Sequence, residues 1–306
     1  MNQIYAVAGV SKQGHHQFLK RQHNKDILID KLRSSIELIR EDHPGCGLEK
    51  IYRGIKPDGI GRDKFISIFK SMGYGVKKKR NFHRTTIPVH VSFPNLISGM
   101  RVDNAYQIWQ SDITYFEVNG RFYYLSFIID VYSKVIKGYY VSDNLKAESN
   151  IKALKMALKN SPDSLNGLIH HSDRGSQFVD KGYQKILSDN GILISMGIQA
   201  QDNAYAERIN GTIKNEYLKY RTIDSFEDLK KHTRQAVNHY NNKRPHNHLP
   251  NMTPNNFEKK YVHLKNSDRP SLIIYAKENF NLSPLDFIPR QVSLAYECPI
   301  NLNSFK

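Results

Sequence analysis

The sequence predicts a mixed α/β domain, with a five-stranded sheet and flanking helices, preceded by a small all-α region. From about residue 106, strand-like runs give way to alternating helices and strands, with three strands before the first helix. Residues 1–90 combine helical periodicity with 18 Lys or Arg against 8 Asp or Glu, which is +10 of the net charge of +16. The length of 306 residues is too great for one average domain.

The α/β region contains a clear turn signal and a recognisable order of strands and helices. Its first strand, YQIWQSDITYFEV, ends at Asn119-Gly120, a strong signal for a two-residue hairpin. The next elements are strands FYYLSFIID and VIKGYYV, a helix over 145–158, a strand over 167–171, a helix near 178–190, the strand GILIS, and helices over about 203–220 and 225–242. This βββ-α-β-α-β-α-α order is that of a ribonuclease-H-like domain, in which the first and fourth strands are central neighbours.

The N-terminal region predicts short basic helices. A short helix and a turn at Gly9-Val10 precede a second helix capped by Ser11, and residues 26–41 continue at helical spacing. GLEKIYRGI and GRDKFISIFKSMGYG follow and resemble helix-turn-helix material, although a helical bundle without DNA contact is the alternative. We expect a helical DNA-binding domain over 1–76, a basic linker over 77–104, a catalytic core over 105–261 and an irregular tail over 262–306.

Charge, cysteine content and apolar segments indicate the kind of partner and the compartment to expect. A pI of about 9.6 favours a polyanion, most often nucleic acid, over a merely basic soluble protein. Cys46 and Cys298 are the only cysteines, so neither a disulfide framework nor a cysteine zinc site is expected. MNQIYAVAGVSKQGHH lacks the apolar stretch of a signal peptide, and no run approaches the ~18 apolar residues of a membrane span. We therefore expect a cytoplasmic protein.

Three acids are the candidate catalytic residues. Asp112 lies inside the first strand, where an aspartate costs stability unless a cation compensates it. Asp173 follows the fourth strand in HSDRGSQF, at the strand end where α/β sheets place their ligands. Glu207 begins a helix whose exposed face also carries Asn210 and Lys214.

Converging carboxylates without His or Cys ligands select Mg²⁺ or Mn²⁺. Two such ions could act on one phosphodiester, one activating the attacking oxygen and the other stabilising the leaving oxygen. Each acid also has a structural alternative: a hydrogen-bonded strand aspartate, a helix cap and a solvated helix residue, respectively.

Several segments resemble the OrfB catalytic subunit of insertion-sequence transposases of the "IS three" family, which are related to retroviral integrases. The matching segments, over about 105–258, are WQSDITY, FIIDVYSKVIKGYYV, HSDRGSQF, DNAYAERINGTIKNEY and YNNKRPHNHLPNMTPNNFE. GVSKQGHHQF and GLEKIYRGI also resemble the helical region that precedes the core in this family.

The resemblance implies a DDE triad of Asp112, Asp173 and Glu207 that cleaves DNA at inverted-repeat ends and joins the 3′-hydroxyl to a target strand. Asp173 and Glu207 are slightly closer in sequence than is usual for the family. Asp202, interpreted as a cap, and Glu216, on the packed face, are therefore the rival third acids. Asp130 is interpreted as structural.

Contacts with double-stranded DNA are expected from basic and polar residues near these acids. They are Lys214, Asn210, Arg208, Arg174, the linker residues Lys77, Lys78, Lys79 and Arg80, and Arg244, which could instead pack the final helix together with His246. At most one of His170 and His171 is expected to matter. Assembly as a homo-oligomer on DNA and a companion OrfA product are further implications of the family.

Two other functions stay open at this point. One is a related nuclease or phage-type integrase using the same chemistry, and the other is a non-catalytic DNA-binding regulator from a decayed element.

Overall fold

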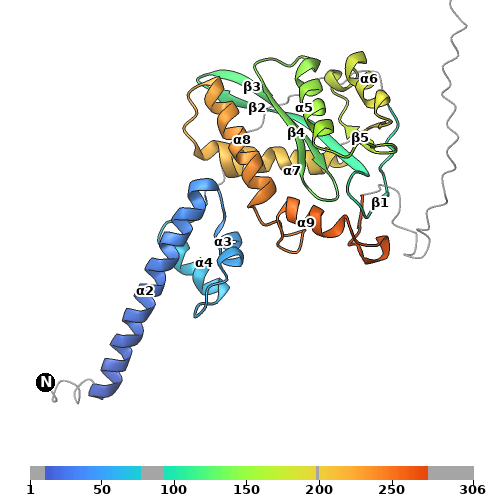
Figure 1. Ribbon diagram of the computed structural model, residues 1–306. Helices are drawn as coiled ribbons and strands as arrows, with labels where there is room; N and C mark the ends of the chain where they lie inside the picture. Colours follow the sequence, from blue (N-terminus) through green and yellow to red (C-terminus); the bar gives the residue numbers. More distant parts are fainter. Residues whose placement is uncertain (1–10, 77–92, 198–199, 275–306) are drawn as a thin grey trace, which may run out of the picture. The chain divides into compact units, whose positions relative to one another are not determined.

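The computed structural model describes residues 11–76, 93–197 and 200–274, and its N-terminal region is helical (Figure 1). Helix α2, Lys12–Asp42, is capped as predicted by Ser11, whose side chain accepts the N–H of Gly14 at 3.0 Å. The two helical stretches expected around 12–22 and 26–41 form this one helix, because neither Gly nor Pro interrupts RQHNKD between them. The short helix predicted before Ser11 lies outside the described residues.

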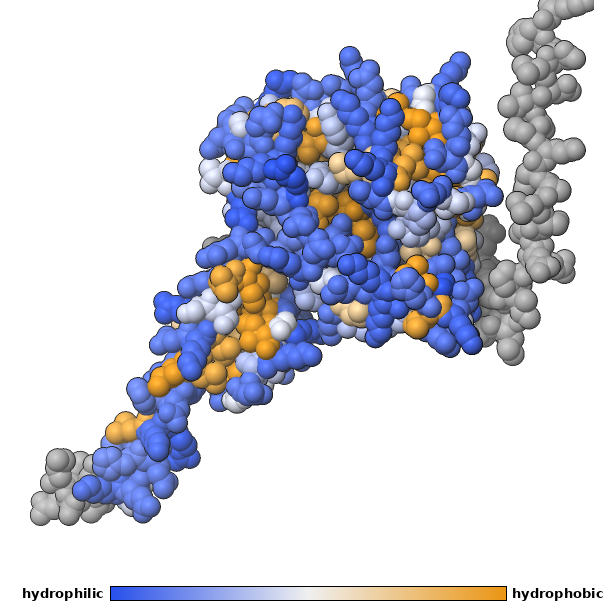
Figure 2. All heavy atoms as spheres, viewed as in Figure 1, coloured by the Kyte–Doolittle hydropathy of each residue, from blue (hydrophilic) through white to orange (hydrophobic). Residues whose placement is uncertain are grey.

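Two short helices pack on the second half of α2. They are α3, Leu48–Ile55, and α4, Arg62–Ser71, separated by a turn at Gly59 with φ +79°. Phe65 and Phe69 of α4 are fully buried against Ile36 and Ile51. In Figure 2 hydrophobic residues show as patches on the N-terminal helices and also on the α/β region, among largely hydrophilic residues.

The α/β region contains the five-stranded sheet that the sequence predicts, with order β4-β3-β2-β5-β6. The strands are β2 Ile108–Val118, β3 Arg121–Asp130, β4 Ile136–Ser142, β5 Ile169–Ser172 and β6 Leu193–Met196. The first three pair antiparallel, whereas β2–β5 and β5–β6 are parallel. The predicted adjacency of the first and fourth strands is therefore confirmed, and the fold is ribonuclease-H-like.

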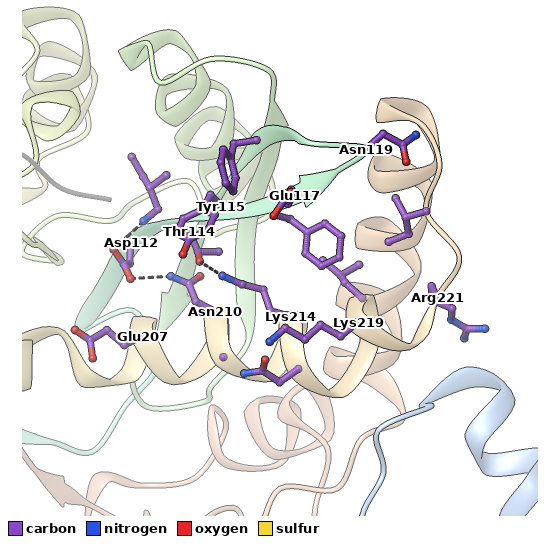
Figure 3. A pocket seen from close by; sticks show the side chains of 17 residues that line it. Asp112, Thr114, Tyr115, Glu117, Asn119, Glu207, Asn210, Lys214, Lys219 and Arg221 are labelled. Carbon is purple, nitrogen blue, oxygen red and sulfur yellow. Dashed lines mark hydrogen bonds between the residues drawn. The ribbon is translucent and has the colours of Figure 1, made fainter. Parts of the chain in front are cut away.

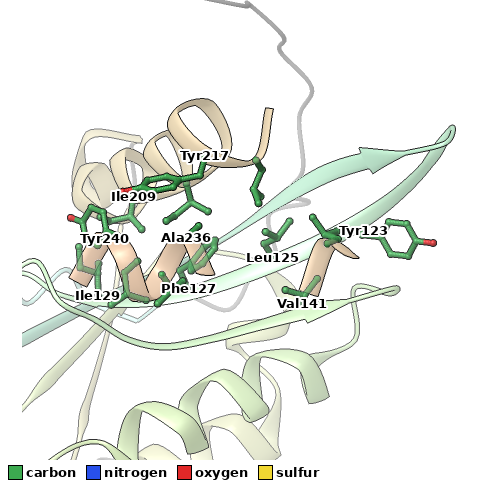
Figure 4. Close-up of a cluster of buried hydrophobic side chains, with 14 of the residues drawn as sticks. Tyr123, Leu125, Phe127, Ile129, Val141, Ile209, Tyr217, Ala236 and Tyr240 are labelled. Atoms are coloured by element: carbon green, nitrogen blue, oxygen red, sulfur yellow. The ribbon is translucent and has the colours of Figure 1, made fainter. Parts of the chain in front are cut away.

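Helices cover both faces of this sheet (Figure 1). One face packs against α5, Ala147–Lys159, and α6, Lys181–Asp189, around the buried side chains of Trp109 and Ile128. The other packs against α7, Ala204–Thr212, and α8, Phe226–Asn242, around Leu125 and Phe127 (Figure 4). Since strand side chains alternate between faces, each strand contributes to both cores.

The hairpin between β2 and β3 forms where the sequence places it. Asn119 has φ +50° and Gly120 has φ +77°, the left-handed conformation that an Asn-Gly turn of type I′ requires at both central residues. This turn fixes the antiparallel register in which Asp112 faces Phe127.

The ends of the core extend beyond the predicted limits. A two-stranded sheet pairs β1, Arg101–Val102, with β7, Leu272–Ile273, which belong to the predicted linker and tail. Ile97, Val102 and Ile274 are buried against β2 and β5 residues, while α9, Pro254–Tyr261, adds Phe257 to the same cluster. Parts of the segments 93–104 and 262–274 therefore pack on the core, since Ile97, Val102 and Ile274 are buried in the same cluster as strand residues.

One close contact in this fold predicts a large loss of stability. A Cβ atom on Gly138 of β4 would lie 2.1 Å from the carbonyl oxygen of Ala153 and 2.8 Å from the backbone nitrogen of Ala157 on α5. We expect Gly138→Ala to lower the free energy of unfolding by roughly 2–3 kcal/mol, because backbone rather than a flexible side chain must move. Urea denaturation measures this effect. Gly54→Ala in α3, where a Cβ meets nothing within 4 Å, is the control and should not be destabilised.

Candidate active site

The register of the two central strands places two of the candidate acids side by side. Ser111 of β2 pairs with Ser172 of β5 in parallel, and Asp112 and Asp173 are the next residues of the two chains. Parallel strands point toward the same edge of a sheet. Asp112 on β2 and Asp173 directly after β5 therefore lie at one edge. The sequence-based placement of Asp173 directly after its strand is confirmed.

Helix α7 brings the third acid to the same edge by lying along β2. Nδ2 of Asn210 donates to Oδ2 of Asp112 at 2.7 Å. Four residues later, in the π-helical turn Ile213–Tyr217 that continues α7, Nζ of Lys214 donates to Oγ1 of Thr114 at 3.1 Å (Figure 3). Two residues of a strand and four of a helix advance by similar distances, so successive contacts stay in step. Glu207 lies one turn before Asn210 on the same side of the helix, as the sequence predicts.

The three carboxyl groups interact electrostatically. Burial, followed by the charge of Asp173, raises the pKa of Asp112 to about 7, and Glu207 adds to the rise. Hydrogen bonds from the backbone N–H of Ile113 and from Asn210 oppose it. The pKa of Glu207 is also raised, first by burial and then by Asp173. Such mutually unfavourable charges at one edge are typical of sites that hold a cation.

Asp173 is held by a tight local turn. Its Oδ1 accepts the backbone N–H of Gly175 at 3.0 Å. A Cβ on Gly175 would lie 3.0 Å from that same oxygen and 3.1 Å from Oε1 of Gln177, so glycine leaves the carboxylate room. Arg174 between them is half-buried, with its Nε enclosed and without a hydrogen-bond partner among the described residues.

The donor types suit a hard divalent cation, because all three are carboxylates. Within the described ranges, however, no group of three or more His, Cys, Asp or Glu side chains is arranged so that it could hold a metal ion. Asp173 thus raises the pKa of both Asp112 and Glu207 from the same sheet edge, but the three acids do not converge on a single point.

An open pocket of about 660 Å³ is lined by Asp112 and Glu207, but not by Asp173. In Figure 3 Asp112, Glu207 and Asn210 lie at one end of this pocket, Lys214 and Lys219 lie side by side in its middle, and Arg221 lies at the other end. Nζ of Lys214 lies 4.4 Å from the centre of the Tyr115 ring, and burial lowers the pKa of this lysine. The pocket therefore combines an acidic end with a basic wall.

Asn210 has a different role from the predicted DNA contact. It is buried, and its amide donates to Asp112, so it orients a catalytic candidate instead of facing a ligand. The remaining basic candidates differ in placement: Arg208 is exposed beside Glu207, while Lys77, Lys78, Lys79 and Arg80 lie outside the described residues.

Arg244 is also placed differently from the predicted DNA contact. Its side chain is 7% exposed, and its Nε and Nη2 donate to the two carboxylate oxygens of Glu216 at 2.9 and 3.0 Å. Lys50 also donates to Glu216, and His43 lies 2.8 Å from it. These hydrogen bonds outweigh burial and hold the pKa of Glu216 well below its usual range. A guanidinium hydrogen-bonded to a buried carboxylate is not free for phosphate, so these contacts favour the packing alternative for Arg244.

The same contacts remove Glu216 as a rival third acid, because its oxygens are occupied by three basic groups. The other rival, Asp202, precedes α7, but the N-cap residue of that helix is Asn203. Glu207 alone of the three lines the pocket that contains Asp112.

Three further residues are structural. Asp130 is buried and accepts hydrogen bonds from the backbone N–H groups of Tyr106 and Ser133, as predicted. His170 lies 2.9 Å from the hydroxyl of Tyr183, and His171 lies 2.8 Å from that of Ser195. Both histidines are fully buried.

The sequence reading missed Gln110 and Thr114. Both lie on the same face of β2 as Asp112; Gln110 contacts the start of α7, and Thr114 contacts Lys214 just after its end. The available signal was the polar residue at every second position of WQSDITY, which marks a strand face that is not simply apolar.

Comparison with known proteins gives consistent matches. Two family models described as integrase core domain match residues 103–201 and 191–254. The chain is 32% identical over 266 residues to the 31 kDa protein of insertion element IS600 from Shigella sonnei, covering 83% of this chain and 97% of that protein. It is 32% identical to the transposase of insertion sequence element IS629 from Shigella sonnei, covering 76% and 80% of the two chains.

Solved structures similar to this chain include two viral proteins. One is the HTLV-2 integrase catalytic core domain in complex with magnesium, at 21% identity and a TM-score of 0.40, covering 54% of this chain and 99% of that chain. The other is a simian T-cell lymphotropic virus intasome, at 18% identity and a TM-score of 0.45, covering 76% and 75%.

Proposed function

Because the chain belongs to the IS three family of insertion-sequence transposases, with an integrase core, we propose that it cleaves the DNA ends of an insertion sequence and joins them to a target. The observation that carries the proposal is the shared sheet edge at which, besides burial, Asp173 and Glu207 raise the pKa of Asp112 and Asp173 raises the pKa of Glu207. Asp112, Asp173 and Glu207 would bind Mg²⁺ or Mn²⁺. Two such ions, when bound, would activate the attacking oxygen and stabilise the leaving oxygen.

The reaction has two phosphoryl transfers. In the first, water attacks a phosphodiester at the element's end, a new P–O bond forms and the P–O3′ bond breaks, which leaves a free 3′-hydroxyl. In the second, that hydroxyl oxygen attacks a target phosphodiester and displaces a 3′-oxygen of the target strand. Each step exchanges one P–O bond for another, so no external energy source and no covalent enzyme–DNA intermediate are required.

The residues around the acids position the DNA and the carboxylates. Asn210 donates to one oxygen of Asp112 and the backbone N–H of Ile113 donates to the other, so both contacts orient this carboxylate at the pocket that it lines. Lys214, on the same helix face as Glu207, would contact a DNA phosphate next to the reacting one. Lys219 and Arg221 continue this basic wall and would track the backbone.

An assay with duplexes taken from the terminal repeats that flank the gene tests the function. We expect Mg²⁺-dependent release of a 3′-hydroxyl end followed by joining to a second duplex. Hydrolysis without joining would favour a nuclease, and metal-independent binding without nicking would favour a DNA-binding regulator. Either outcome contradicts the proposal.

Lys214→Ala should weaken DNA binding through the loss of one phosphate contact. We expect affinity for a duplex of arbitrary sequence to fall by roughly 3- to 10-fold, and the slope of log K against log salt to decrease by about one. Fluorescence anisotropy across a salt series measures both values. Lys185→Ala on α6, which removes an equal charge from an ion pair with Asp189, is the control. If both variants have the wild-type salt slope, Lys214 serves only to hold Thr114.

A further inference from the structure

The N-terminus of α7 is capped by a side chain from a different element. Oε1 of Gln110, on β2, accepts the backbone N–H groups of Tyr205 at 3.1 Å and Ala206 at 3.3 Å. Its Nε2 donates to the carbonyl oxygen of Asp202 at 2.9 Å. The first N–H groups of a helix have no partner within the helix, so this single amide satisfies two of them and a preceding carbonyl.

The helix has no side-chain cap of its own. Asn203 occupies the N-cap position but makes no capping hydrogen bond. Its Nδ2 donates instead to the carbonyl oxygen of Ser111 on β2 at 2.9 Å. The residue that usually fixes a helix start locally is therefore used, like Gln110, to attach α7 to the strand.

These contacts lie between two of the acids. Gln110 is 1% exposed and lies two residues before Asp112, hence on the same face of β2. Glu207 is the residue directly after Ala206, the second helix residue that the amide binds. The amide thus sets how far the backbone of Glu207 stands from the strand that carries Asp112.

A restraint is needed at this point because the carboxylates repel one another. Asp112 on β2 and Glu207 on α7 line the same pocket, so their ionised carboxylates would push the start of α7 away from the sheet edge. Farther along the helix, the contacts of Asn210 and Lys214 with β2 hold only the later turns. The first turn, which carries the acid, depends on Gln110 and Asn203.

We propose that Gln110 is a positioning residue that holds Glu207 in register with Asp112, so that the acids can bind divalent cations together. The inference rests on the proposed function of the acid edge. Glutamine meets the chemical demand because one end of its amide accepts and the other donates. Glutamate lacks the donor for Asp202, and methionine, of similar length, provides neither hydrogen bond.

Gln110→Met in the full chain tests this role. We expect kcat for strand joining to fall roughly 10- to 100-fold, with KM for DNA changed by less than about twofold. The Mg²⁺ concentration that gives half of the metal-induced thermal shift, measured without DNA, should rise at least about fivefold. Hydrogen exchange at the amides of Tyr205 and Ala206 should become faster, which reports the cap directly.

Gln107→Met is the matched control. Oε1 of Gln107 likewise accepts two backbone N–H groups, from Asp103 at 2.9 Å and Asn104 at 3.0 Å, but it does not contact α7. It should lose similar stability and keep the wild-type kcat and Mg²⁺ midpoint. If Gln110→Met does not fold, Asn203→Leu, which removes the companion attachment, should give the same shifts in kcat and in Mg²⁺ midpoint.

The outcomes separate the two proposals. A wild-type protein that joins no DNA contradicts the proposed function, whereas the metal-induced thermal shift still decides the role of Gln110. Equal Mg²⁺ midpoints for wild type, Gln110→Met and Gln107→Met would overturn the inference, because the amide would then be structural only.

Discussion

Asp173→Asn and Glu207→Gln should each abolish strand joining, lowering its rate by at least about 10³-fold while leaving DNA affinity within about threefold. Each variant keeps the size of the side chain and removes one of the two negative charges that, besides burial, raise the pKa of Asp112. DNA affinity should persist because the basic wall of Lys214, Lys219 and Arg221 is unchanged. A single-turnover joining assay, with anisotropy for binding, measures both quantities.

Asp202→Asn is the control for this experiment. Asp202 also lies next to α7, but its carbonyl, not its carboxylate, receives the hydrogen bond of Gln110. This variant should retain joining within about tenfold of wild type. Joining above about 1% of wild type by Asp173→Asn or Glu207→Gln removes that residue from the triad, and a loss as large in Asp202→Asn transfers the third role to it.

Asp112→Asn should stabilise the protein when no divalent cation is present. The folded protein raises the pKa of Asp112 from 3.8 to about 7, mainly by burial and by the charge of Asp173. A shift of this size makes ionisation cost roughly 2–4 kcal/mol of folding stability above pH 7, and the neutral asparagine avoids that cost. Urea denaturation in the presence of a chelator should show a higher free energy of unfolding for the variant.

The pH dependence has a definite sign. Below the unfolded pKa of 3.8 the carboxyl group is protonated in both states and contributes nothing. Between 3.8 and about 7 the unfolded state loses its proton first, so the wild type loses stability as the pH rises. The advantage of Asp112→Asn should therefore be larger at about pH 8 than at about pH 5. Asp163→Asn, at an exposed position, should show no such difference.

Magnesium should reverse the order of stability of the wild type and Asp112→Asn. A cation that binds the folded wild type stabilises it by mass action, whereas the variant lacks one of the three carboxylates. We expect the thermal midpoint of wild type to rise with Mg²⁺ and that of Asp112→Asn to stay nearly constant. Equal Mg²⁺ responses would show that Asp112 does not bind the ion.

The sequence determined the strand order, the hairpin at Asn119-Gly120 and the two faces of α7. Each depends on a local pattern: alternation within a strand, a turn that requires positive φ, and helical spacing that separates Ile209 and Ile213 from Glu207. Such patterns appear among neighbouring residues, because burying one face of a helix or strand requires apolar residues at a fixed spacing within that segment. The same logic placed Asp173 at a strand end, and the register of β2 with β5 then set it beside Asp112.

The tertiary structure alone decided which polar groups meet. Gln110 contacts Tyr205 and Ala206, which lie 95 and 96 residues farther along the chain. Arg244 pairs with Glu216, which lies on the packed side of its helix. A buried amide or guanidinium needs a partner, but its own neighbourhood in the sequence does not say which one. Long-range packing determines those partners. Asn210, expected to contact DNA, donates a hydrogen bond to Asp112, and Arg244 forms a buried ion pair.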